Sequence, residues 1–129
     1  MKRIFISFLL IFFIYFPTES KVKAYSSDPE KFISEIINEA KLILNSQNTR
    51  EEKSEKLSII ALKTVDVKGI GYYTLGKKRK EITTEQKNKY DQIFEKYFLK
   101  SFTSRLTDYS DPKISVLSAE KVNEKYTIV

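Results

Sequence analysis

Apolar residues recur every three or four positions in the first half of the chain, which is the spacing of amphipathic helices. The first such stretch starts at Asp28–Pro29–Glu30, where a capping side chain, a proline and an acid fall in the order of a helix start. A second stretch follows Thr49, which forms a capping-box pattern with Glu52. These patterns predict two helices whose inner faces carry, in order, Phe32, Ile33, Ile36, Ile37, Ala40, Ile43 and Leu44, and then Leu57, Ile60, Ala61 and Thr64.

A third, shorter helix is predicted after Asp66, which can cap it, and Gly76 is a natural end. Its apolar positions are joined by Gly69 and Gly71, each of which costs about 1 kcal/mol relative to alanine inside a helix. Two interpretations are open: close packing against another element, which we favour, or a weak helix.

The longest predicted helix begins at a second capping box, formed by Thr83 and Gln86. Its apolar residues form a stripe at steps of three and four. Such a stripe is usually ordinary core, but five of its seven members are aromatic, so the wall of a cavity is a competing interpretation. The stripe consists of Tyr90, Ile93, Phe94, Tyr97, Phe98, Phe102 and Leu106.

The pattern changes to alternation after Asp111–Pro112. Residues 113–118 are predicted to form a strand, 120–124 a polar turn, and 125–129 the start of a partner strand. We therefore predict an α+β fold, with helices packed on one face of an antiparallel sheet whose first strands alone are present. A two-stranded ribbon is marginal and leaves an open edge, so we expect a truncated chain that pairs or aggregates through Tyr126–Val129.

The chain begins like a secretory signal peptide. Met1–Lys2–Arg3 is cationic, and the apolar run Ile4–Phe16 ends at Pro17. This apolar run is shorter than the roughly 20 residues that a membrane span needs. The alternative to a cleaved leader is an uncleaved membrane anchor. We predict a leader over residues 1–24, cleaved near Ala24 or, as a second choice, after Ser20, and a single exported domain over residues 25–129. Removing the leader lowers the net charge from +6 to +3, which argues against nucleic-acid binding.

The residue types present argue against an enzyme. The sequence contains neither histidine nor cysteine, which removes the usual general base, the thiolate nucleophile and the commonest metal ligands. No catalytic residue, metal site or cofactor is predicted. The basic run Lys77, Lys78, Arg79 and Lys80 has two interpretations: a solvated connection between helices, or a contact for anionic lipid head groups or an acidic partner.

Residues 66–109 resemble the MlaC family, also called the toluene-tolerance auxiliary family, of periplasmic phospholipid-binding proteins. An acid-led helix closes in Leu75–Gly76, like the family's "LG" pair, and Thr83–Gln86 is similar to its "T-x-E-Q" helix start. A third match is the spacing of aromatic and apolar residues that runs from Tyr90 to Tyr109. The family's "D-x-x-x-E-G-x-S" segment has no counterpart, so no residue is carried over from it.

The resemblance implies a periplasmic carrier that moves phospholipid between an outer-membrane lipoprotein complex and the substrate-binding subunit of an inner-membrane ABC transporter. Acyl chains would occupy a dry cavity, with the head group near solvent. The alternative is an exported, non-enzymatic adaptor that docks a partner through its basic loop and aromatic helix. The candidate cavity residues are Ile70, Tyr73, Leu75, Phe94, Phe98, Phe102, Val116 and Ile128.

Overall fold

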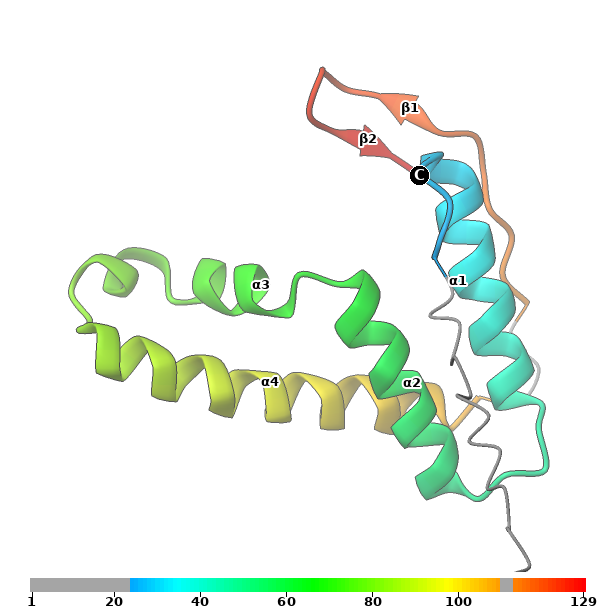
Figure 1. Ribbon diagram of the computed structural model, residues 1–129, viewed down its shortest axis with the longest axis horizontal. Coiled ribbons are helices and arrows are strands. Elements are labelled where there is room, and N and C mark those ends of the chain that lie inside the picture. Colours follow the sequence, from blue (N-terminus) through cyan, green and yellow to red (C-terminus); the bar gives the residue numbers. More distant parts are fainter. Residues whose placement is uncertain (1–23, 110–112) are drawn as a thin grey trace, which may run out of the picture.

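The computed structural model describes residues 24–109 and 113–129. Four α-helices come first, followed by a small hairpin (Figure 1). The predicted leader up to residue 23 and the pair Asp111–Pro112, after which the sequence pattern changes to alternation, lie outside the described residues. In chain order the elements are α1 (Pro29–Leu44), α2 (Arg50–Thr64), α3 (Val67–Thr74), the 3₁₀ helix η1 (Gly76–Lys80), α4 (Thr84–Leu106), β1 (Glu120–Lys121) and β2 (Thr127–Ile128).

The helices begin where the capping signals predicted. The Asp28 side chain accepts a hydrogen bond from the Lys31 backbone N–H at the start of α1. Both capping boxes form, at Thr49 for α2 and at Thr83 for α4. These caps satisfy backbone N–H groups that have no partner within the helix, so the helix starts are determined locally.

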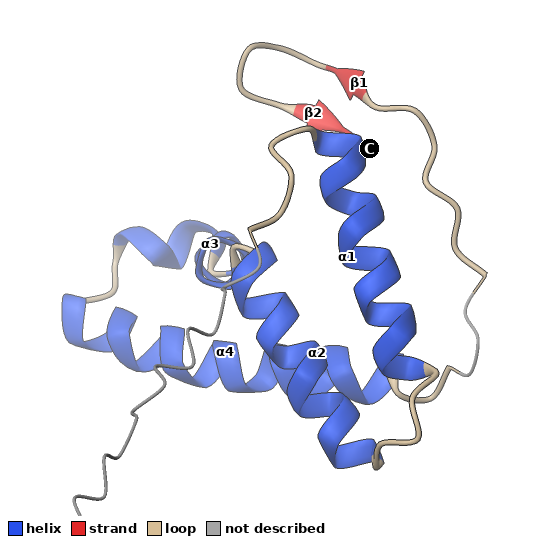
Figure 2. Ribbon diagram, turned by 45° about the vertical axis from the view of Figure 1, so that its right-hand side comes forward, coloured by secondary structure: helices blue, strands red, loops and turns tan. Residues whose placement is uncertain are grey.

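The helix α2 joins two parts of the molecule. It packs against α1 on one side and against α4 on the other, while α3 runs back along α4 (Figures 1 and 2). The buried apolar residues gather around this junction, and none of the described residues of the hairpin is buried. The buried apolar residues are Leu44, Leu57, Ile60, Ala61 and Val67.

The hairpin confirms the predicted α+β class but corrects the position of its first strand. Residues 113–119 form no strand, and β1 lies instead at Glu120–Lys121, inside the segment predicted as a turn. The turn is set by Asn123, whose side chain accepts hydrogen bonds from the backbone N–H groups of Lys125 and Tyr126. An alternating segment needs a paired neighbour to become a strand, and residues 113–119 have none among the described residues.

The two short strands are antiparallel, with Glu120 opposite Ile128 and Lys121 opposite Thr127. Both views place the hairpin beside the N-terminal end of α1 and away from α4 (Figures 1 and 2). Within the part of the chain that the structure describes, no helix is long and apolar enough to cross a membrane.

Candidate functional site

Four aromatic rings form a continuous ladder along α4. Tyr90, Phe94, Phe98 and Phe102 are four residues apart, and their successive ring centroids lie 5.7, 6.2 and 5.8 Å from one another. The planes of successive rings differ by 26°, 26° and 8°, so the rings are stacked. All four side chains are half-buried. We call these four residues the aromatic ladder; it presents a rigid apolar strip that the helices cover only in part.

Two residues of the predicted stripe do not belong to this strip. Ile93 and Tyr97 are 58% and 69% exposed, so including them in a stripe that forms the core or lines a cavity was wrong. The reason is geometric: positions four apart stay nearly in line on a helix, whereas a residue three positions on turns toward the flank. The covered face is therefore narrower than the sequence pattern suggested.

The helix α3 covers the N-terminal half of the aromatic ladder. The Tyr90 hydroxyl donates a hydrogen bond to the Gly71 carbonyl oxygen at 3.1 Å, and it lies 2.8 Å from the Thr74 hydroxyl. A Cβ atom at Gly71 would meet the Phe94 ring at 2.6 Å. The predicted close packing is therefore confirmed at Gly71, where only hydrogen fits.

The other glycine of α3 has a different environment. A Cβ atom at Gly69 would meet the carboxylate of Asp66, which caps the same helix and accepts a hydrogen bond from the Gly69 N–H. The expectation of contact with another element is therefore wrong at Gly69. Gly76 ends α3 with a φ of +54°, as its position predicted, although the chain continues into η1 rather than into a loop.

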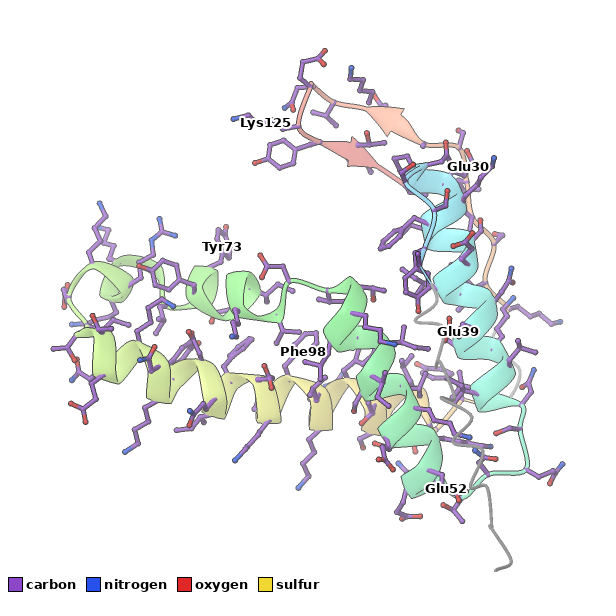
Figure 3. The ribbon with its side chains drawn as sticks, in the orientation of Figure 1. Glu30, Glu39, Glu52, Tyr73, Phe98 and Lys125 are labelled. Carbon is purple, nitrogen blue, oxygen red and sulfur yellow. The ribbon has the colours of Figure 1, made fainter. Side chains whose placement is uncertain are left out.

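The helix α2 covers the C-terminal half. Thr103 is 2% exposed, and its hydroxyl accepts a hydrogen bond from Ser54 at 2.6 Å while donating to the Leu99 carbonyl oxygen. Phe98 lies between these two covers and points from α4 toward the side on which α2 and α3 lie (Figure 3). Polar contacts therefore fix α4 on both sides of Phe98: Tyr90 bonds to α3, and Thr103 bonds to α2.

The structure brings only part of the predicted cavity set together. Phe94, Phe98 and Phe102 stand side by side, whereas the β2 residue Ile128 lines a separate hollow of about 420 Å³ with the start of α1. The α3 residues Ile70 and Tyr73 are 41% and 78% exposed, and Leu75 and Val116 are half-buried.

The basic run is wholly exposed and forms η1, with two of its cations held in place. Lys78 pairs with Glu81 at 2.7 Å, and the Arg79 guanidinium lies 6.0 Å from the Tyr72 ring centroid. The Lys87 ammonium lies 5.2 Å from the same centroid. A hydrogen bond with Asp91 raises the pKa of Lys87.

A hollow between α1 and α2 was missed by sequence reasoning. It has a volume of about 350 Å³, and its apolar lining includes Leu42 and Ile59, which are 75% and 47% exposed. Both residues lie outside the predicted inner faces. Apolar residues outside the inner face of a helix were therefore the feature of the sequence that could have indicated this hollow. At its edge the Tyr25 hydroxyl donates a hydrogen bond to Glu39; burial, followed by this bond, raises the pKa of Tyr25.

The site contains apolar rings and exposed cations rather than reactive groups. No group of three or more potential metal-binding side chains occurs among the described residues.

Comparison with known proteins gives one match. The family model described as MlaC protein matches residues 33–129, which include the aromatic ladder, η1 and the hairpin. No curated protein and no solved structure matches the chain.

Proposed function

Because the chain belongs to the MlaC family, we propose that it is a periplasmic carrier that shuttles phospholipid between the outer and inner membranes. Membership indicates a periplasmic, phospholipid-binding transport role rather than an enzymatic one. The donor and acceptor would be an outer-membrane lipoprotein complex and the substrate-binding subunit of an inner-membrane ABC transporter. The family match over residues 33–129 is the single observation that carries this proposal.

The aromatic ladder supplies the contact that a carrier of acyl chains needs. Burying one methylene group is worth about 0.8 kcal/mol, so a lipid is held by apolar area rather than by a particular polar contact. From Tyr90 to Phe102 the ladder spans roughly 18 Å, at about 1.5 Å per helical residue. The hydrocarbon core of a bilayer is roughly 30 Å thick, and half of it is the depth of one acyl chain. The length of the ladder is close to that half.

Phe98 is the position at which this proposal is best tested. It is half-buried at the middle of the ladder, away from the tight contact between Gly71 and Phe94. A carboxylate in this strip would have to lose water when an acyl chain covers it. Tyr97 is the matched control, because it is the adjacent residue on the same helix and is 69% exposed.

Native mass spectrometry of protein recovered from the periplasm measures both the processed mass and any bound lipid. We expect a phospholipid adduct on the native chain and on Tyr97→Asp, and its loss from Phe98→Asp. Far-UV circular dichroism shows whether each variant has kept its helices. The milder Phe98→Ala should lower lipid occupancy in a folded protein, which covers the case in which the aspartate variant does not fold.

Two results would contradict the proposal at different levels. Full lipid retention by a folded Phe98→Asp protein would remove the aromatic ladder from the lipid contact. A correctly processed native chain that never carries lipid would count against the carrier function itself, and would favour the exported adaptor that docks a partner through η1 and α4.

A further inference from the structure

Positive charge is concentrated on the part of the molecule formed by α3, η1 and α4. Residues 66–106 contain ten basic and five acidic side chains, whereas the other described residues contain nine basic and ten acidic ones. The net charge of the mature chain is therefore localised rather than spread evenly. The element η1, with four basic residues in succession, lies at the end of this part that is farthest from α1 (Figure 1).

The geometry of η1 divides its four cations into two kinds. Lys78 and Arg79 are engaged within the fold, by Glu81 and by the Tyr72 ring respectively. Lys77 and Lys80 are exposed and have no ion-pair partner among the described residues. Because a 3₁₀ helix has three residues per turn, side chains three positions apart lie on the same face. Lys77 and Lys80 therefore present two adjacent free cations.

An aromatic ring lies beside this pair. Tyr73 is 78% exposed, and Figure 3 shows it pointing away from α4. With Gly76, Lys77, Arg79 and Lys80 it lines an open hollow of about 400 Å³. A tyrosine has an apolar ring and a polar hydroxyl, which suits the boundary between head groups and hydrocarbon.

We propose that Tyr73, Lys77 and Lys80 form a docking surface for anionic phospholipid bilayers. The two ammonium groups would meet lipid phosphates while the ring enters the head-group layer. A bilayer fits these few residues better than an acidic protein does, because a specific protein interface generally buries more than about 1,000 Å² with close shape complementarity. The inference rests on the proposed carrier function for its purpose, namely bringing the carrier to the membrane where lipid is exchanged.

Vesicle co-sedimentation tests this surface. The probe is the mature protein mixed with vesicles of phosphatidylcholine alone or of phosphatidylcholine with phosphatidylglycerol. We expect binding to the anionic vesicles only, and its loss between about 0.1 and about 1 M salt, where the Debye length falls from about 10 to about 3 Å. Replacing both cations, as Lys77→Gln with Lys80→Gln, should weaken binding about 30-fold, since each lysine contributes about fivefold near such a surface.

The matched control removes the same charge from the same part of the molecule. Lys96→Gln with Lys100→Gln changes two exposed lysines of α4 and should weaken binding by only a fewfold. Tyr73→Ser should weaken binding to anionic vesicles severalfold even at the lower salt concentration, because apolar burial is added to the electrostatic attraction. Circular dichroism confirms that every variant is folded.

Three outcomes would overturn the inference: equal losses in the two double variants, equal binding to neutral vesicles, or no vesicle binding by the native protein. The last would favour an acidic protein partner. Native mass spectra of the same preparations keep the two proposals apart, because a lipid adduct without vesicle docking contradicts only the docking surface, whereas docking without any adduct contradicts only the carrier function.

Discussion

Gly71→Ala gives the sharpest test of how α3 and α4 fit together. In an exposed helix interior this substitution would stabilise the protein by about 1 kcal/mol, because alanine has the higher helix propensity. Here the new methyl group would lie 2.6 Å from Cδ1 and 2.9 Å from Cγ of Phe94. Those atoms belong to a rigid ring that is stacked on its neighbours in the aromatic ladder, so they have little room to move.

The structure therefore predicts that Gly71→Ala destabilises the protein instead of stabilising it. Overpacking a well-packed site costs about 1–3 kcal/mol, and subtracting the propensity gain leaves a net destabilisation of about 1 kcal/mol, within a range of roughly 0–2. Gly69→Ala is the matched control. There the new methyl group meets the flexible Asp66 carboxylate, so a cap weakened by about 1 kcal/mol offsets a similar propensity gain and the net change should be close to zero.

Urea denaturation followed by circular dichroism measures these differences in the free energy of unfolding. Phe94→Ala removes all the ring atoms that obstruct position 71, so Gly71→Ala in that background should stabilise the protein by about 1 kcal/mol. A stabilising effect of Gly71→Ala in the otherwise native chain would show that α3 does not approach the Phe94 ring closely, and would refute the packing described above.

Two further predictions concern contacts that hold α2 and α1. Thr103→Val removes the hydroxyl that joins α4 to Ser54 and should lower the free energy of unfolding by about 1 kcal/mol, with little further loss in the double variant that also carries Ser54→Ala; fully additive losses would contradict a shared hydrogen bond. The raised pKa of Tyr25 stabilises the fold below the unfolded pKa of 10.0, and this contribution is lost as the pH rises through the folded value. Tyr25→Phe should therefore flatten the fall in stability above about pH 10, and an unchanged pH profile would contradict the burial of Tyr25 and its bond to Glu39, which together raise this pKa.

The candidate site was predictable in part. The aromatic residues of the longest helix were identifiable from their spacing, and three of them, Phe94, Phe98 and Phe102, stand together in the structure. Tyr73 was expected in the same cavity but is 78% exposed beside η1. Its helical position is compatible with either environment, because the short α3 has a covered and an open side and the sequence does not say which side α4 occupies.

Local chemistry in the sequence determined where the helices begin and where α3 ends. Asp28, Thr49, Asp66 and Thr83 each accept a hydrogen bond from a backbone N–H within three residues, so no distant part of the chain is needed to specify these starts. Gly76 ends α3 for an equally local reason, its positive φ. Family membership was likewise visible in the order of the motifs.

Contacts between distant segments decided the rest. Residues 113–119 alternate like a strand but have no neighbouring strand in the described chain, whereas β1 and β2 pair because Asn123 closes the turn between them. The spacing of Ile93 and Tyr97 in the sequence is that of core residues. In the structure both are exposed, because α2 and α3 contact only a narrow face of α4. Hydrogen bonds within one turn of a helix can be identified from neighbouring residues, but burial and strand pairing depend on which surfaces meet after the chain has folded.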